Sequence, residues 1–381
     1  MTGVSDLRIQ RRHRAIAFWL LAVAAMVFAM VVIGGVTRLT HSGLSMVEWQ
    51  PVTGWLPPST EAEWSAVFRQ YQRFPEFREV NAGMTVAEFK GIFWLEFIHR
   101  LWGRLIGVAF AVPFMVFLLK GWVDRRLAPK LVVIFVLGGL QGVLGWYMVK
   151  SGLVDRPDVS QYRLTAHLGA ALLIYAYMLW VAFGLLAPEP GPTPRNLSRF
   201  AAALAAMVFV TALSGGFVAG LDAGFAYNTF PLMDGELIPE HLFAVTPLYL
   251  NFFEDVTTVQ FTHRLLAITT AALVLVFWFA AAKAPLAARP RLAAHALLVA
   301  AATQVTLGIS TLVLIVPVPL AAAHQAGAVV LLTTALWAAF EMRQPRRKTP
   351  AVEEVRSGGG VGVGKSDRSA KIDGSILARK L

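Results

Sequence analysis

"LEFIHRLWGR" occupies residues 95–104 and places one Glu, one His and two Arg at the start of an apolar run that extends to Leu119. The run is long enough to cross a bilayer, and each charge at membrane depth costs at least about 2.5 kcal/mol. Charged residues inside such segments are usually functional. The stretch therefore predicts a membrane-spanning helix that holds a polar or ligand-binding site.

The whole chain has the composition of an integral membrane protein. Of its 381 residues, 56% are hydrophobic and 15% are charged, whereas soluble domains are about 25% charged. Cysteine is absent, which excludes disulfides, thiolate metal sites, iron–sulfur clusters and covalently attached c-type heme. The net charge of +11 comes from basic residues at predicted helix ends and in the tail. We interpret it as a topology signal and expect no nucleic-acid partner.

Apolar runs of about 20 residues predict an all-α polytopic membrane protein with eight transmembrane helices. The predicted spans are 15–37, 93–122, 131–149, 164–186, 200–220, 258–282, 292–316 and 320–340.

The loops set the orientation. Basic residues lie before the first span, between the second and third, after the sixth and after the eighth, whereas the loop 221–257 has six acidic residues and no Lys or Arg. The positive-inside rule then places both termini in the cytoplasm. We expect a multi-pass protein of the cell inner (cytoplasmic) membrane.

The first outer loop, residues 38–92, contains helix signals of its own. Thr60 and Glu63 have the spacing of a capping box, and apolar residues follow at helical spacing through 64–71. We expect a short amphipathic helix on the outer surface, acting as an interfacial anchor or as a lid. A second capping box, from Thr85 to Glu88, leads into the second span.

The two halves of the chain repeat each other. "GGVTRLTHSGLSM" from Gly34 resembles "GGFVAGLDAGFAY" from Gly215, "FIHRL" resembles "FTHRL", "QGVLG" resembles "QVTLG", and "TAHLGAALL" resembles "AAHQAGAVV". Four helices per half give parallel repeats, so we expect two four-helix bundles related by a pseudo-twofold axis along the membrane normal. The predicted parts are a basic cytoplasmic arm 1–14, an N-terminal bundle 15–186, a cytoplasmic linker 187–199, a C-terminal bundle 200–340 and a disordered cytoplasmic tail 341–381.

Four repeated histidines, His99, His167, His263 and His324, lie on the even-numbered spans. Each follows the start of its span by only a few residues, so all four lie about 5–9 Å below the outer boundary. A membrane histidine can simply hydrogen-bond to a neighbouring helix. Two matched pairs at one depth instead favour two bis-histidine heme sites, because imidazole nitrogen is a common axial ligand of heme iron.

Charged neighbours accompany these histidines. Glu96, His99 and Arg100 share one helical face. Arg100 and its repeat partner Arg264 can pair with heme propionates or extend to the membrane interface. Gln260 stands at the repeat position of Glu96. This asymmetry suggests that one heme reacts while the other only carries electrons. His41, which aligns with an aspartate, is left without a role.

At these residues the chain resembles the heme A synthase family. The shared marks are E-x-x-H-R in the second span, single histidines in spans four, six and eight, and the duplicated bundle, together covering Gly34 to Trp337. The resemblance implies oxidation of a methyl group of heme O to the formyl group of heme A, by successive hydroxylation with oxygen from water, for assembly of aa3-type cytochrome c oxidase. It also implies heme O synthase, cytochrome oxidase assembly factors, membrane lipid and an unidentified electron acceptor as partners.

The resemblance assigns roles to particular residues. His99 and His167, with Arg100, are implied to bind the substrate heme, and Glu96 matches the family's functional carboxylate. His263 and His324, with Arg264, are implied to bind a heme b cofactor. Some family members carry a cysteine pair in the first outer loop, so this cysteine-free chain resembles the proteobacterial and mitochondrial branch.

Two other functions remain open at this point. A di-heme cytochrome b that moves electrons across the membrane needs hemes near both faces, whereas all four candidate ligands lie near one face. A heme carrier or exporter needs the histidines but has no use for Glu96. The carboxylate itself is expected to act as a base or to stabilise a cationic intermediate. Its alternative is a structural role, holding Arg100 or the ring nitrogen of a ligand.

Overall fold

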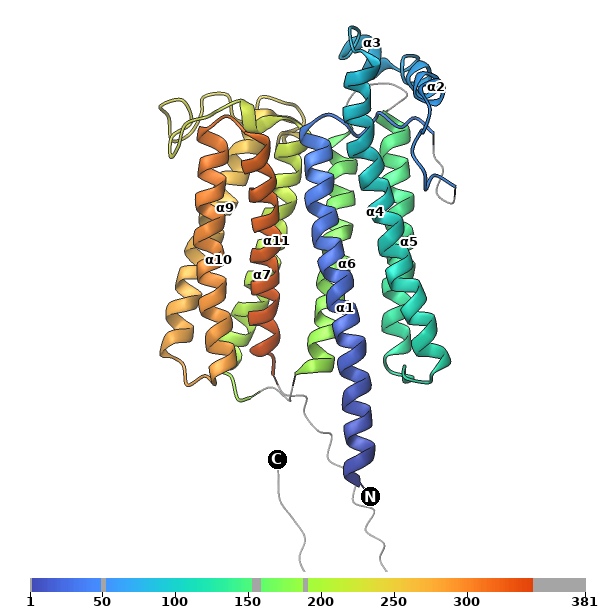
Figure 1. The fold of residues 1–381 in the computed structure, drawn as a ribbon. Coiled ribbons are helices and arrows are strands. Elements are labelled where there is room, and N and C mark those ends of the chain that lie inside the picture. The colour runs from blue at the N-terminus through green and yellow to red at the C-terminus, as the bar shows by residue number, and fades with distance from the viewer. Residues whose placement is uncertain (1, 49–52, 153–158, 188–190, 345–381) are drawn as a thin grey trace, which may run out of the picture. The chain divides into compact units, whose positions relative to one another are not determined.

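The computed structural model describes residues 2–48, 53–152, 159–187 and 191–344. Within these residues eight helices are long and apolar enough to cross a membrane, which confirms the predicted fold class (Figure 1). These helices are α1 (Thr2–Leu39), α4 (Val86–Leu119), α5 (Ala128–Gly152), α6 (Gln161–Leu186), α7 (Arg195–Gly220), α9 (Val256–Lys283), α10 (Ala288–Val313) and α11 (Val318–Glu341). They lie in one compact unit.

Three helix starts differ most from the predicted segments, and the other boundaries differ by at most four residues. Helix α1 begins at Thr2, so the predicted basic arm is continuous with the first spanning helix. Helix α4 begins at Val86, before the predicted start at 93, because the Thr85–Glu88 capping box forms and starts the helix there. Helix α7 begins at Arg195 and so includes the end of the predicted linker. From residue 345 onward, the predicted disordered tail lies outside the described residues.

The first long loop forms the expected amphipathic helix, α2 (Glu61–Tyr71), with the Thr60–Glu63 capping box in place. Its apolar face packs on the extended start of α4, next to the short helix α3 (Pro75–Glu79). The aromatic core of this contact consists of Trp64, Phe68, Tyr71, Phe89, Phe93 and Phe97, all buried. Since protein already covers this face, α2 does not offer it to lipid as an anchor.

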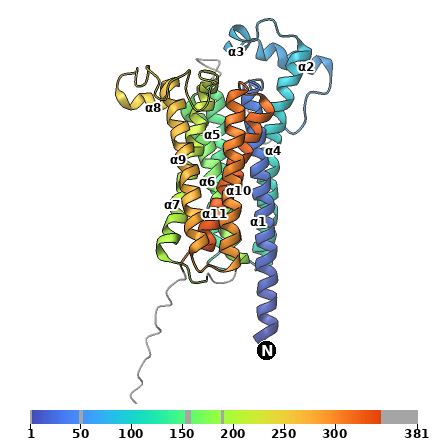
Figure 2. The same ribbon diagram turned by 90° about the vertical axis from the view of Figure 1, so that its left-hand side faces the viewer.

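The helices are antiparallel from one span to the next, so α1 begins and α11 ends at the same end of the array (Figures 1 and 2). We call the opposite end, which carries α2 and α3, the upper end. The long segment between α7 and α9 also lies there, and it includes the short helices η1 (Ala223–Phe225), η2 (Leu248–Leu250) and α8 (Asn251–Glu254).

Helix packing follows the sequence repeat. In the N-terminal half α1 packs on α4 and α6, and α5 packs on the same two helices. In the C-terminal half α7 packs on α9 and α11, and so does α10. Between the halves α1 packs on α11 and α6 packs on α7, while α6 and α11 also meet each other. A twofold axis that exchanges α1 with α7 and α6 with α11 produces this set of contacts.

Glycines allow the two halves to approach closely. A side chain on Gly35 of α1 would overlap the Gln325 amide of α11, with its Cβ only 1.8 Å from the amide oxygen. A side chain on the equivalent Gly216 of α7 would crowd Thr165 of α6, at 2.9 Å. The Gln325 amide instead donates to the Val31 carbonyl at 2.9 Å. Small residues are the usual means of close helix packing in membranes.

Candidate functional site

Each of the four repeated histidines contacts a glycine of the preceding spanning helix. A methyl group added to any of these glycines would lie closer to the ring Cε1 atom than an ordinary van der Waals contact. The pairs and distances are Gly34–His99 (3.3 Å), Gly145–His167 (3.0 Å), Gly215–His263 (3.2 Å) and Gly308–His324 (2.8 Å). The repeat therefore preserves a glycine for each histidine, and that glycine fixes how closely the ring approaches the neighbouring helix.

The histidines form one pair in each half. His99 and His167 lie close enough to interact electrostatically, and so do His263 and His324. All four side chains are partly buried. No group of three or more metal-ligating side chains occurs in the part of the chain that the structure describes. Two imidazoles without a third ligand suit a heme, because the porphyrin supplies the remaining nitrogens.

A glutamine holds the ring of the second histidine in each half. The Gln141 amide nitrogen lies 3.1 Å from Nδ1 of His167 and donates to the carbonyl of the same residue at 2.8 Å. Gln304 repeats both contacts with His324, at 3.1 and 3.0 Å. These glutamines begin the repeated "QGVLG" and "QVTLG" segments, but sequence reasoning did not give them a role. Such contacts orient a ligand ring for its metal.

The first histidines of the two halves differ in their partners. Ser214 lies 2.8 Å from Nδ1 of His263 through its hydroxyl oxygen. The repeat places Ile33, an aliphatic residue, at the position of Ser214. The two pairs are therefore built on one plan, but within the described residues the Ser214–His263 contact has no counterpart at His99.

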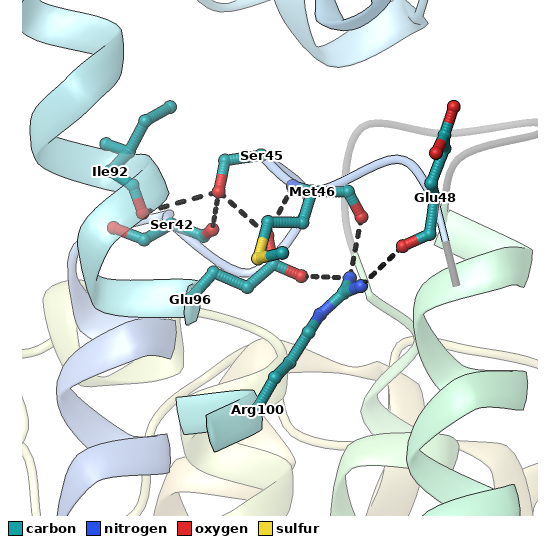
Figure 3. A network of polar contacts seen from close by, with 7 residues as sticks. All are labelled: Ser42, Ser45, Met46, Glu48, Ile92, Glu96 and Arg100. Carbon is teal, nitrogen blue, oxygen red and sulfur yellow. Dashed lines mark hydrogen bonds and ion pairs between the residues drawn. The ribbon is translucent and has the colours of Figure 1, made fainter. Parts of the chain in front are cut away.

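Glu96 lies at the centre of a polar network between α4 and the loop that follows α1 (Figure 3). The residue is 2% exposed. One carboxylate oxygen forms an ion pair with Arg100. The other accepts from the Ser45 hydroxyl at 2.7 Å and from the Met46 backbone N–H at 2.6 Å. Among the described residues Glu96 makes no hydrogen bond to a histidine ring. Of the two structural roles expected for Glu96, the structure therefore fits the one in which it holds Arg100, and not the one in which it holds a histidine ring.

Arg100 extends this network to the loop backbone. Its guanidinium donates to the carbonyl oxygens of Met46 at 2.6 Å and of Glu48 at 2.8 Å (Figure 3). Together, Glu96 and Arg100 satisfy both the N–H and the C=O of Met46. The pair therefore holds residues 45–48 against the upper part of α4.

Arg264 binds the corresponding loop of the C-terminal half in the same way. It donates to the carbonyl oxygens of Tyr227 at 2.7 Å and of Thr229 at 2.8 Å. These residues are the repeat equivalents of Met46 and Glu48. Gln260 donates to the Tyr227 carbonyl at 3.1 Å, whereas its counterpart Glu96 accepts from a backbone N–H. Pairing of either arginine with a heme propionate stays a prediction.

The helix ends below these loops also match. His41 and Asp222 follow α1 and α7 at equivalent positions, and both have left-handed backbone geometry, with φ of 49° and 51°. Asp222 forms a salt bridge at 3.0 Å with Arg38 of the other half. His41 thus lies in the left-handed turn that ends α1. The residue type alone did not indicate this position.

The fold and the sites define a polytopic membrane protein with one histidine pair in each of two related halves. Among the described residues, the buried carboxylate of Glu96 lies on the same helix as a histidine of the N-terminal pair, and Gln260 takes its place in the other half. The COX15-CtaA family of cytochrome oxidase assembly proteins matches residues 17–336. The chain is 58% identical to heme A synthase of Nitrosospira multiformis over 336 residues, which cover 87% of this chain and 94% of the relative.

Other relatives give the same result. Heme A synthase of Paramagnetospirillum magneticum is 51% identical over 89% of this chain and 97% of its own. Heme A synthase COX15 of Homo sapiens is 48% identical over 90% of this chain and 86% of its own. The chain belongs to the heme A synthase (COX15/CtaA) family.

Proposed function

We propose that this protein is a heme A synthase, a membrane oxidoreductase that converts heme O to heme A for the assembly of aa3-type cytochrome oxidase. The observation that carries the proposal is the asymmetry of the two histidine pairs, of which only the N-terminal one has Glu96 on the same helix. Family membership, at 58% identity to a heme A synthase, supports the same reaction.

The N-terminal half is the proposed reacting site. His99 and His167 bind the iron of heme O from opposite helices, which fixes the porphyrin between α4 and α6. Converting a methyl to a formyl group takes one oxygen atom from water and releases four electrons and four protons, which we assign to two successive hydroxylations. Glu96 accepts a proton from water or stabilises positive charge on the carbon being oxidised.

The C-terminal half is the proposed cofactor site. We assign His263 and His324 as the residues that would hold a heme b, and Arg264 as a residue that would pair with its propionates. The residues fit such a group, because Gly215 and Gly308 let both imidazole rings pack closely against the neighbouring helices, and Gln304 and Ser214 orient the rings. The Gln304 amide oxygen is buried next to Gly327 of α11 and has no hydrogen-bond partner among the described residues. A bound heme b supplies one-electron transfer.

The site position also suggests an orientation. All four histidines lie in the upper parts of their helices, near the segment 221–257 that has no Lys or Arg. At the lower end, basic residues gather in the first part of α1 at positions 8–14, between α4 and α5, and at the adjoining ends of α9 and α10. The positive-inside rule supports cytoplasmic termini, an inner-membrane location and heme sites toward the periplasm. Heme O synthase, cytochrome oxidase assembly factors and an electron acceptor are the partners this role requires.

Heme identification after supply of heme O tests the proposal. The purified protein is given heme O, and the extracted hemes are separated by chromatography. Wild type should yield heme A, and His99→Ala should not, while His263→Ala should lose the b-type spectrum. A protein that binds heme O without forming any heme A, despite a suitable oxidant, would instead be a carrier or a cytochrome.

A further inference from the structure

The Ser45 hydroxyl occupies a buried position among three acceptors (Figure 3). Its oxygen lies 2.7 Å from a Glu96 carboxylate oxygen, 2.9 Å from the Ser42 carbonyl and 3.3 Å from the Ile92 carbonyl. The residue is 2% exposed. A hydroxyl has one hydrogen to donate and two lone pairs with which to accept. Ser45 can therefore donate a hydrogen bond to only one of these acceptors at a time.

The C-terminal half provides an internal comparison. The repeat that aligns His41 with Asp222 places Ala226 at the position of Ser45 and Gln260 at the position of Glu96. The loop there is still held by Arg264 through the same two carbonyl contacts. Loop attachment thus needs no serine at this position. Serine and carboxylate occur together in one half, and both are replaced in the other.

The partners of the Glu96 carboxylate differ in what they can do. Arg100 is the charged group in contact with it, and Tyr71 of α2 lies within electrostatic range. The Arg100 guanidinium and the Met46 N–H can only donate hydrogen bonds. The Ser45 hydroxyl can also accept, because its hydrogen can turn to the Ser42 carbonyl. Among the described residues, it is therefore the one hydrogen-bond partner of this carboxylate that can either donate or accept.

We propose that Ser45 is a positioning residue that holds Glu96 in place in both of its protonation states. With Glu96 ionised, the Ser45 O–H donates to the carboxylate. When Glu96 takes up a proton from water, its new O–H donates to the Ser45 oxygen, and the Ser45 hydrogen moves to the Ser42 carbonyl. The proposal rests on the proposed role of Glu96, since a carboxylate that never changes protonation state has no need of such a partner.

A double-mutant cycle tests the proposal in the full-length protein with heme O as substrate. The variants are Ser45→Ala, Glu96→Gln and the two combined, with Ser42→Ala as the matched control. Ser42 is an equally buried loop serine whose hydroxyl contacts Thr40 and not Glu96. Bound b-type heme and expression level report on folding, and spectroscopic titration reports on heme O affinity.

We expect Ser45→Ala to lower the maximal rate of heme A formation about tenfold, the effect of losing one hydrogen bond to a charged group. Heme O affinity should not change, because Ser45 does not contact the substrate in this scheme. In the Glu96→Gln background the same substitution should have no further effect, and Ser42→Ala should keep the wild-type rate. Ser45→Thr, which retains the hydroxyl, should recover part of the rate.

Two results would overturn the proposal. Equal rate losses from Ser45→Ala in the wild-type and Glu96→Gln backgrounds would show that the serine acts through the loop and not through the carboxylate. A wild-type rate for Ser45→Ala would show that it has no role. Failure of the proposed function itself gives a different pattern, in which Glu96→Gln alone forms heme A at the normal rate.

Discussion

Adding one methyl group to Gly145 tests whether the histidines are placed by their neighbouring glycines. An alanine at this position of α5 brings its Cβ to 3.0 Å from Cε1 of His167, whereas ordinary contacts begin at 3.4 Å. The ring must therefore retreat by about 0.4 Å. Gln141 holds its Nδ1 edge at 3.1 Å, so the ring cannot simply turn away. Metal–ligand distances tolerate only about 0.2 Å.

The matched control lies one turn earlier on the same helix. Gly142 has nothing within 4 Å of an added Cβ. Both substitutions gain the same intrinsic helix propensity, about 1 kcal/mol per glycine replaced by alanine. Any difference between Gly142→Ala and Gly145→Ala therefore reports the displaced ring and not the stability of α5.

The assay is titration of the purified variants with heme O, followed by the Soret band and by heme A formation. We expect Gly145→Ala to lose about 10–100-fold in heme O affinity or rate, the range found when groups that orient a metal ligand are changed. Gly142→Ala should behave as wild type, and both should keep the b-type heme of the other half. Unchanged heme O binding by Gly145→Ala, or an equal loss in Gly142→Ala, would refute the reasoning.

Three further predictions address the other residues. Replacing His263 or His324 with Ala should remove b-type absorption while heme O titration of the N-terminal half stays normal, and equal loss of both pigments in folded protein would contradict separate sites. Glu96→Gln keeps the size of the side chain but removes its charge, so heme O or a partly oxidised heme should accumulate with b-type heme near wild type; normal heme A formation would show that the carboxylate is not catalytic. Burial, and after it the Glu76 carboxylate, raises the pKa of Tyr71 in the folded protein. Above about pH 10 Tyr71 therefore ionises in the unfolded chain before it does so in the folded protein, and the folded protein loses stability as the pH rises. The thermal unfolding temperature of wild type should therefore fall more steeply than that of Tyr71→Phe between about pH 9 and 11. Parallel curves of unfolding temperature against pH would rule this out.

Most of the fold could be predicted from the sequence, because the sequence patterns that indicate it are either local or repeated. Apolar length predicted each span, and the Thr60 and Thr85 capping boxes predicted where α2 and α4 begin. The span prediction nevertheless began α4 at 93, because the residues before Phe93 are too polar for a hydropathy pattern. An amphipathic pattern also does not say what covers its apolar face. The structure places the start of α4 over that face of α2.

The candidate site was predicted less completely. The four histidines and Glu96 follow from the repeat and from their cost in a membrane. Ser45, in contrast, lies 51 residues from Glu96 in a loop without periodicity, so no sequence pattern joins them. The glycines were visible as repeat marks. Only the helix packing shows that each of them faces a histidine.

The contacts between the two halves bear on how one chain can have different residues at equivalent positions of two related sites. Because α1 meets α11 and α6 meets α7, the same surface of each half is used against the other, as in the isologous interface of a homodimer. A true homodimer must change both copies of a residue together. In one continuous chain the equivalent positions 96 and 260 can carry different residues, here Glu96 and Gln260, while an arginine holds the loop in both halves. Joining the halves thus permits two different chemistries within a single symmetric frame.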